Sequence, residues 1–343
     1  MSGATAAFPT APLSRRRFLG IAAAAAGVAL MPGLLRAAPL PAGIPVRVWR
    51  GTALGADAML QIAHPDPAEA DRLIALSLAE VARLEKVFSL YRPDSALVRL
   101  NRDGMLDRPP ADLVRLLSEA VAFGRRSGGA FDVTVQPLWQ LYAGHFGRPG
   151  ADPAGPPEAA VQATRRLVDY RAVEVDAGRI AFARRGMAVT LNGIAQGYIT
   201  DRVTERLIAE GLGQVLVDLG EIRAVGRHPA GRPWTVGLKD PSDETRLTAT
   251  LEIADRAVAT SAGSGTSFDP AGRFAHLLDP ASGHSAADWL SVSVLAADAT
   301  TADALSTALS IVPADRAAAI LNGLPGVGAR LTRRDGTVLS LPA

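Results

Sequence analysis

A long amphipathic segment, Pro67 to Phe88, constrains the fold of this 343-residue chain more than any other feature. Its apolar residues recur at helical spacing along one side, so that side has to be buried against another part of the protein. The two segments before it, Val46 to Thr52 and Ala58 to His64, alternate in the manner of two strands joined by a short turn. This order predicts a helix that packs on a sheet.

The rest of the chain mixes helices with short strands. Further helices are expected at 95–100, 110–126, 195–210 and 302–312. Further strands are expected at 173–175, 180–182, 187–191, 215–219, 234–238, 248–253, 257–260 and 291–295, with a terminal hairpin at 330–341. The stretch Gly144 to Pro157 is rich in Pro and Gly and is interpreted as a surface loop rather than an interdomain linker. The predicted class is α+β, with mixed, largely antiparallel sheets and packed helices.

The N-terminus predicts export. Residues 13–20, Leu-Ser-Arg-Arg-Arg-Phe-Leu-Gly, contain paired arginines followed by Phe-Leu, which is typical of a twin-arginine signal. A weakly apolar stretch follows at 18–35, interrupted by Gly and Pro, and Ala37 and Ala38 offer a cleavage site. We therefore expect a signal peptide at 1–38, a single domain at 39–343 and a periplasmic location. The alternative is a signal that is retained as an inner-membrane anchor.

Composition narrows the classes of partner. The net charge of +2 includes four signal arginines, and without them 32 basic side chains stand against 34 acidic ones, a net charge of −2. A nearly neutral chain without a long basic run argues against nucleic acid as a partner. The absence of cysteine excludes a lipoprotein anchor and disulfide bonds. No second segment is long and apolar enough to span a membrane, so no transmembrane segment is expected in the mature chain.

The helix expected after residue 300 carries the most informative pattern. Leu305, Ala308, Leu309 and Val312 fall on one face, and the opposite face holds Asp303, Ser306, Thr307 and Ser310. The simpler interpretation of such a polar face is exposure to solvent. However, solvent-exposed faces favour Lys, Glu and Arg, whereas this one has only short oxygen-bearing side chains. Asp303 and Thr307 are one turn apart, so both can point at one hard cation.

Two further segments contain candidate residues. Residues 274–278 are interpreted as a strand that places His276 and Leu278 on one face and ends at Asp279-Pro280. A lone His in a strand is more often structural than catalytic, so His276 remains open on this ground. Residues 189–201 are interpreted as a strand, a bend at Gly193 and a helix, an arrangement that can expose backbone groups to a phosphate or a metal. Many ordinary strand-to-helix turns also contain Gly.

Two loops complete the set. Residues 127–134, Ser-Gly-Gly-Ala-Phe-Asp-Val-Thr, and residues 88–95, Phe-Ser-Leu-Tyr-Arg-Pro-Asp-Ser, could each be an ordinary loop. Taken in chain order, however, the five segments resemble the motifs of the FAD:protein FMN transferases, the flavin transferase family also called ApbE. The resemblance extends from about residue 50 to residue 312, and it implies an ApbE or T-fold-like architecture. One such motif is weak support for the family, but five in the same order are strong support.

The resemblance implies an enzyme that transfers FMN from FAD to a threonine of an acceptor protein and releases AMP, with Mg²⁺ as cofactor. The acceptor would be another envelope protein. Residue by residue, the resemblance implies the following roles. Asp303, Thr307, the backbone carbonyl of Gly193 and the nearby Ser306 belong to the metal site, and His276 is the catalytic residue. FAD-contacting positions are Tyr91, Ala130, Phe131, Asp132, Thr190, Gln196 and Leu278.

The chain departs from the family pattern at three positions. Thr190 stands where the family has Asp, Gln196 where it has Lys, and Arg50 where a Met is common in the first strand. The first two changes remove charge at positions that the resemblance assigns to flavin binding. Two alternatives to transfer therefore remain. One is hydrolysis of FAD to FMN and AMP, and the other is a non-catalytic periplasmic FAD-binding protein.

Overall fold

The structure is a computed structural model, and it describes residues 28–29, 44–53, 56–241 and 243–342. The signal predicted for residues 1–38 lies outside the described residues, apart from the two-residue strand β1 (Val28–Ala29). Among the described residues, no helix has both the length and the apolar character needed to cross a membrane.

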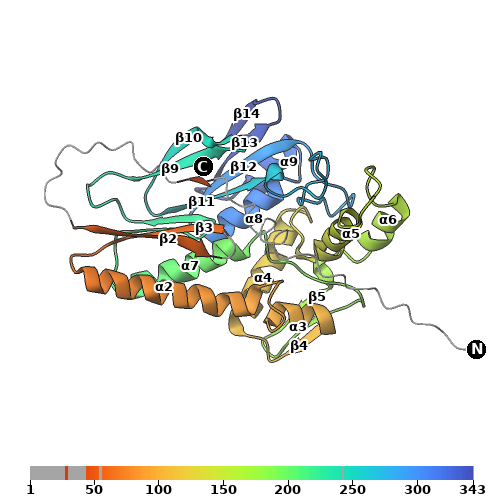
Figure 1. Ribbon diagram of the computed structural model, residues 1–343, viewed down its shortest axis with the longest axis horizontal. Helices are drawn as coiled ribbons and strands as arrows, with labels where there is room; N and C mark the ends of the chain where they lie inside the picture. The colour runs from red at the N-terminus through yellow and green to blue at the C-terminus, as the bar shows by residue number, and fades with distance from the viewer. Residues whose placement is uncertain (1–27, 30–43, 54–55, 242, 343) are drawn as a thin grey trace, which may run out of the picture.

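An eight-stranded antiparallel sheet forms the centre of the fold (Figure 1). In spatial order its strands are β14 (Val338–Leu341), β13 (Gly328–Arg333), β12 (Trp289–Ala296), β11 (Arg256–Ala262), β8 (Ile222–Val225), β7 (Val215–Asp218), β3 (Ala56–Ala63) and β2 (Val46–Ala53). The predicted N-terminal strand pair and C-terminal hairpin are confirmed as β2–β3 and β13–β14. The predicted class, α+β with largely antiparallel sheets, is also confirmed.

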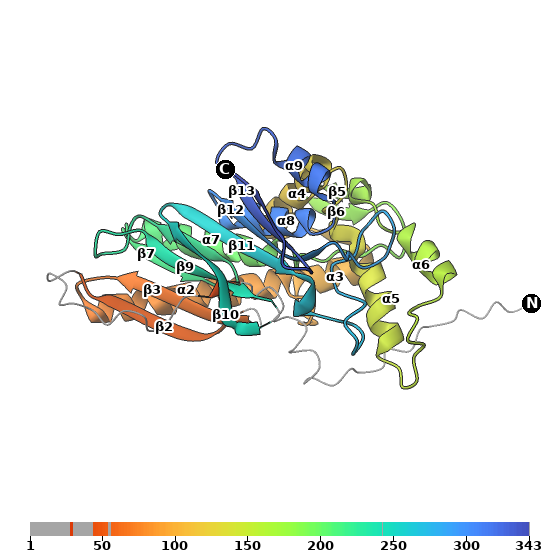
Figure 2. The ribbon, with the colours of Figure 1, turned by 90° about the horizontal axis from the view of Figure 1, so that it is seen from above.

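Helices cover one face of this sheet, and a small second sheet covers part of the other (Figures 1 and 2). The helical layer contains α2 (Pro67–Phe88), α7 (Ala195–Ala209), α8 (Ala299–Leu309) and α9 (Ala314–Leu321). The second sheet pairs β9 (Trp234–Asp240) with β10 (Asp243–Ile253) and β1. Strand β7 shows why both faces are covered: Val215 and Val217 pack toward the helices, and Leu216 packs toward β9 and β10.

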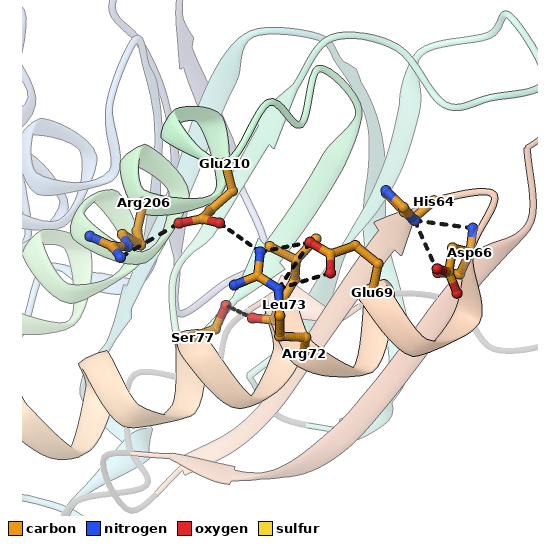
Figure 3. A network of polar contacts seen from close by, with 8 residues as sticks. All are labelled: His64, Asp66, Glu69, Arg72, Leu73, Ser77, Arg206 and Glu210. Atoms are coloured by element: carbon orange, nitrogen blue, oxygen red, sulfur yellow. Dashed lines mark hydrogen bonds and ion pairs between the residues drawn. The ribbon is translucent and has the colours of Figure 1, made fainter.

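Helix α2 has the bounds that its periodicity predicts, Pro67 to Phe88. Asp66 caps its N-terminus by accepting a hydrogen bond from the backbone N–H of Ala68 at 2.8 Å. Arg72 then joins α2 to the end of α7, because its guanidinium contacts both Glu69 and Glu210 at 2.6 Å (Figure 3). The buried apolar face of α2 packs with α7 in one core, and the exposed bridge adds little to that packing.

The remaining elements lie toward one end of the molecule (Figure 1). They are α3 (Ala96–Asp103), β4 (Met105–Asp107), α4 (Ala111–Arg126), η1 (Val133–Val135), α5 (Gln136–Phe146), α6 (Glu158–Arg165), η2 (Tyr170–Ala172), β5 (Val173–Val175), β6 (Arg179–Phe182) and η3 (Gly263–Gly265). Helices α5 and α6 form a separate small core with the loop at 266–285, built from Leu138, Tyr142, Val161 and Leu278.

Two predicted strands are wrong. Residues 187–191 have no regular structure, because the side chain of Asn101 binds both the N–H and the carbonyl of Val189, at 2.7 and 2.8 Å, in place of a neighbouring strand. Residues 274–278 form only isolated bridges at Ala275 and Leu278 within an irregular loop. In both places apolar side chains are buried without regular strand pairing.

Candidate active site

Helix α8 closely approaches two glycines, Gly197 in the first turn of α7 and Gly193 in the turn directly before it. A Cβ on Gly197 would lie 2.3 Å from the carbonyl oxygen of Ala299 and 2.8 Å from the Cβ of Asp303. One turn earlier, a Cβ on Gly193 would lie 2.8 Å from the hydroxyl oxygen of Thr307. Only glycine, which has no side chain, fits at these two positions. The segment 189–201 and the polar face of α8 therefore lie side by side.

Asp303 connects the two helices at this contact. Its Oδ2 accepts a hydrogen bond from the backbone N–H of Gly197 at 3.0 Å, in the first turn of α7. Helix α7 has no side-chain cap of its own at Ile194, so the carboxylate from α8 supplies one. The sequence prediction that Asp303 and Gly193 belong to one site is consistent with this geometry.

A cluster of hydroxyl groups lies beside Asp303. The hydroxyl of Ser306 is 2.8 Å from that of Ser261 at the end of β11, and the hydroxyl of Thr307 is 3.4 Å from the same Ser261 oxygen. Ser306 is fully buried and also donates to the carbonyl of Asp303 at 2.9 Å. The polar face of α8 is therefore buried against β11 and α7, and the interpretation as a solvent-exposed face is wrong.

The carboxylates around the contact between α7 and α8 have few basic side chains beside them to balance their negative charge. Burial raises the pKa of Asp303 to about 7, and the nearby Asp201 adds to this rise. Burial, together with Asp303 and Asp218, also raises the pKa of Glu221 well above its ordinary value. Among the described residues, Arg223 pairs with Asp201, but no ion pair reaches Asp303, Glu221 or Asp218. A site with this charge distribution favours a bound cation.

Gln196 lies between this cluster and the turn from β7 to β8. Its amide nitrogen is buried and has no hydrogen-bond partner among the described residues. A Cβ on Gly220, which has a φ of 101°, would lie 2.4 Å from that nitrogen. Buried amide donors are nearly always satisfied, so this nitrogen can bind an acceptor atom of a water or of another bound molecule.

His276 lies in the loop that follows Ser261. The backbone carbonyl of Thr266 is 3.1 Å from its Nδ1 and also accepts its backbone N–H at 3.0 Å. A carbonyl oxygen can only accept, so Nδ1 carries the proton and Nε2 keeps a lone pair. Burial lowers the pKa of His276, which favours this neutral form at neutral pH. A histidine in this state is suited to accept a proton at Nε2.

Three of the predicted flavin-contacting residues lie near the loop before α7. Tyr91 is half-exposed, and its hydroxyl bonds to the side chain of Asn192. The backbone N–H of Thr190 donates to the carbonyl of Val133 at 2.8 Å, which places the 127–134 motif beside it. Asp132 is buried and caps η1, where it accepts from the backbone N–H of Thr134 at 2.8 Å. The carboxylate of Asp132 therefore has a structural function.

The other three predicted contacts have buried side chains. Ala130 belongs to the apolar core with α8 and α9, and Phe131 packs edge to face on Phe123. Leu278 belongs to the separate core of α5 and α6, 4% exposed. The side chains of these residues are occupied by packing, so their contact with a ligand would be through the backbone.

Sequence reasoning missed four polar residues around the contact: Ser261, Glu221, Asp218 and Asp201. Ser261 ends a strand, and Asp218 and Glu221 flank a tight turn at Gly220, with no local motif to distinguish them. Asp201 did carry a signal, since it lies four residues after Gly197 on the same face of α7.

Replacing Gly197 with Ala is expected to destabilise the protein by about 1–3 kcal/mol, because the methyl group would collide with the backbone of Ala299. Denaturant unfolding measures this change. The matched control is Gly144→Ala on α5, where a Cβ meets nothing within 4 Å and a gain of about 0.5–1 kcal/mol is expected. Equal stability of the two variants would contradict the close approach of α7 and α8.

Solved structures with this fold are known. A flavinyl transferase ApbE of Pseudomonas stutzeri, in apo form, superposes with a TM-score of 0.72 at 27% identity, covering 87% of this chain and 96% of that one. The ApbE protein of Thermotoga maritima superposes with a TM-score of 0.76 at 26% identity, covering 86% and 96%. The architecture predicted from the family resemblance is thereby confirmed.

Sequence relatives agree with the structures. The FAD:protein FMN transferase of Treponema pallidum is 35% identical over 265 residues, which cover 71% of this chain and 72% of the relative. That of Haemophilus influenzae is 31% identical over 240 residues, covering 67% and 69%. By fold and by these relatives, this chain is an enzyme of the transferase class. A sequence profile of the ApbE family matches residues 54–331, and the chain belongs to that family.

Proposed function

We propose that this chain transfers FMN from FAD to a threonine of an acceptor protein, releases AMP and uses Mg²⁺ as cofactor. The observation that carries the proposal is the contact between α7 and α8, where Asp303, Thr307 and Gly193 meet. The relatives that bear the name FAD:protein FMN transferase support the flavin chemistry. The magnesium ion, the threonine and the AMP are our extension of it.

The residues present fit a flavin nucleotide. The unpaired amide nitrogen of Gln196 is a donor suited to an oxygen atom of FAD, although it lacks the charge of the family's Lys. Tyr91 offers a half-exposed aromatic ring next to Asn192, where a planar ring system can pack. Thr190 lies beside the 127–134 segment, because its backbone N–H donates to the carbonyl of Val133. We propose these residues as the FAD-contacting set, with Leu278 at its edge.

They also fit one hard cation. Asp303 would supply a carboxylate oxygen, Thr307 a hydroxyl and Gly193 a backbone carbonyl, with Ser306 close by. No group of three or more His, Cys, Asp or Glu side chains in the described part of the chain is arranged to hold a metal. Mg²⁺ does not need such a group, because it keeps several water ligands and binds substrate phosphates. When bound, it would neutralise negative charge on the phosphates.

His276 would act on the incoming hydroxyl. The acceptor threonine oxygen forms a bond to the phosphorus on the FMN side of FAD, and the bond from that phosphorus to the AMP oxygen breaks. The proton of the hydroxyl passes to Nε2 of His276, whose Nδ1–H is held by the carbonyl of Thr266. Ser261 and Ser306 hold α8 and β11 together beside the reacting groups.

The experiment is a transfer assay with defined products. The purified chain is incubated with FAD, Mg²⁺ and an acceptor domain that carries one candidate threonine, with the Thr→Val acceptor as control. We expect the acceptor to gain the mass of FMN while AMP appears in equal amount, and we expect EDTA to stop both. AMP without an adduct would indicate hydrolysis of FAD. Neither product, with FAD still bound, would indicate a binding protein.

We further propose that residues 1–38 form a twin-arginine signal, so that residues 39–343 work in the periplasm on an envelope acceptor. The paired arginines and the apolar stretch support this proposal. A folded reporter fused to residues 1–38 should reach the periplasm, and replacing Arg15 and Arg16 with Lys should retain it in the cytoplasm. A reporter that stays in the membrane fraction would favour the retained anchor.

A further inference from the structure

The contact of α8 with α7 and the turn before it has three levels, spaced four residues apart in the sequence of each segment. The helices run in opposite directions, so that Asp201 faces Ala299, Gly197 faces Asp303 and Gly193 faces Thr307. Four residues correspond to about 6 Å along a helix, so the three levels span about 12 Å. The level of Gly197 and Asp303 and the level of Gly193 and Thr307 contain the proposed cation ligands. The first level contains Asp201, which has no assigned role.

Asp201 caps α8 from the neighbouring helix. Its Oδ1 accepts from the backbone N–H of Ala299 at 2.9 Å, and its Oδ2 accepts from the backbone N–H of Thr300 at 2.8 Å. The hydroxyl of Thr300 donates to the same Oδ2 at 2.5 Å. The cap that belongs to α8 itself, Asp298, binds only Thr301, at 2.7 Å. The first two amides of α8 therefore depend on Asp201.

Asp201 is also fixed from the sheet. Arg223 on β8 contacts its Oδ1 at 2.6 Å, and the Asp201 side chain is only 6% exposed. One carboxylate thus joins α7, α8 and β8 at a single buried point. The arrangement is reciprocal, because Asp303 of α8 caps the first turn of α7 while Asp201 of α7 caps the first turn of α8. Each cap fixes the position of the helix that carries the other.

We propose that Asp201 is a positioning residue, which sets the register of α8 against α7 and so brings the oxygens of Asp303, Thr307 and Gly193 together. The inference rests on the proposed function, since it concerns the same cation site. A slip of α8 by one residue would rotate its side chains by about 100° and would separate Asp303 from Gly197. Asp201 bonds to the first residues of α8 and not to the proposed cation ligands, and its charge also contributes to the raised pKa of Asp303. Thr300→Val keeps that charge and therefore isolates the effect of position.

Asp201→Asn tests the proposal in the full chain. The amide keeps an acceptor for one backbone N–H of α8 but presents a donor to the other. We expect the Kd for Mn²⁺, used as a paramagnetic substitute for Mg²⁺, to rise roughly tenfold, the size of effect that follows loss of a helix cap. Amide exchange at Ala299 and Thr300 should accelerate by a similar factor. The Kd for FAD without metal should stay within about twofold, because the side chain of Asp201 bonds to α8 and to Arg223 and not to the proposed FAD-contacting residues.

Thr300→Val provides a second, milder variant in case Asp201→Asn folds poorly. It keeps the pair between Asp201 and Arg223 and removes only the hydroxyl contact, whereas Thr300→Ser retains that contact and should restore Mn²⁺ affinity. Glu205→Gln, an exposed change one turn further along α7, is the matched control and should leave all values unchanged.

The outcomes separate this inference from the proposed function. Wild-type Mn²⁺ affinity in both Asp201→Asn and Thr300→Val would overturn the positioning role, even if the wild-type chain transfers FMN. Parallel loss of metal binding, FAD binding and thermal stability in Asp201→Asn, with no effect of Thr300→Val, would also overturn it. A chain that binds Mn²⁺ and shows the expected changes but never transfers FMN would refute the proposed function and leave the positioning role supported.

Discussion

Replacing Asp303 with Ala is expected to lower kcat/KM for FMN transfer at least about 1,000-fold, which corresponds to about 4 kcal/mol of transition-state stabilisation. The carboxylate is the only charged group among the proposed cation ligands, and it also caps the first turn of α7 through Gly197. Mass spectrometry of the acceptor over time, at several Mg²⁺ concentrations, measures the loss. Excess Mg²⁺ should not restore the rate.

Asp303→Asn separates charge from position. The amide oxygen can still accept from Gly197, so α7 and α8 should stay in register while the anionic ligand is lost. Stability should be retained, because burial raises the pKa of Asp303 to about 7. A group with a raised pKa contributes stability at low pH that is lost as the pH rises through that value. At pH 8 the buried carboxylate is ionised, and the burial of its charge lowers the free energy of unfolding. The neutral amide of Asp303→Asn carries no such charge, so the Tm should not fall.

The control for both variants is Asp315→Asn, an exposed acidic position in the first turn of α9, where activity should stay within about twofold. An Asp303→Asn enzyme with wild-type turnover and wild-type Mg²⁺ dependence would rule out the cation site at this contact.

Replacing His276 with Ala is expected to lower kcat about 100- to 10,000-fold, the range for loss of a general base, while the Kd for FAD changes by about twofold or less. The reason is the geometry of the ring, in which Nδ1–H is bound to Thr266 and Nε2 is left to accept a proton. Stopped-flow transfer assays and FAD fluorescence titrations measure the two quantities separately.

The pH profile gives a second measure of the same role. Burial lowers the pKa of His276, so the acid limb of kcat in the wild-type enzyme should lie below pH 6.5. In His276→Ala this limb should disappear. His284→Ala is the control, because His284 is half-exposed beside Tyr142 and Glu158, away from β11. If His276→Ala keeps more than half of the wild-type kcat, the base must be another group.

Local sequence patterns predicted a helix or hairpin well where all of its signals lie in one short segment. Helix α2 begins and ends at the predicted residues, because its apolar periodicity and its Asp66 cap lie within the segment itself. Helix α8 begins at Ala299 and ends at Leu309, so both ends lie three residues before the predicted bounds of 302 and 312. Asp298, directly before Ala299, is a local N-cap signal for this start that the apolar periodicity alone does not include. The second cap, Asp201, is 98 residues away in the sequence, and no local pattern contains it.

In the candidate site, too, residues within local motifs were predicted, and residues that come from distant segments were not. The family resemblance predicts site functions for Asp303, Thr307, Gly193 and Gln196. The structure places Asp303 against Gly197 and Thr307 against Gly193, and Gln196 is the neighbour of Gly197 at the start of α7. The resemblance did not identify Ser261 or Glu221, whose importance arises from the end of β11 and the turn after β7. Nor did it reveal that Asp132 acts as a cap. The sequence does not distinguish a loop carboxylate that binds a ligand from one that binds the neighbouring backbone.

The reciprocal caps between α7 and α8 have a consequence for how this enzyme matures. The bond between Gly197 and Asp303 joins residues 106 positions apart, and that between Asp201 and Ala299 joins residues 98 apart. Contacts of such long sequence separation form late, because a large chain loop has to close first. The oxygens that would hold the ion therefore converge only when the whole chain is in place. Cation uptake would then stabilise the finished molecule and no earlier intermediate.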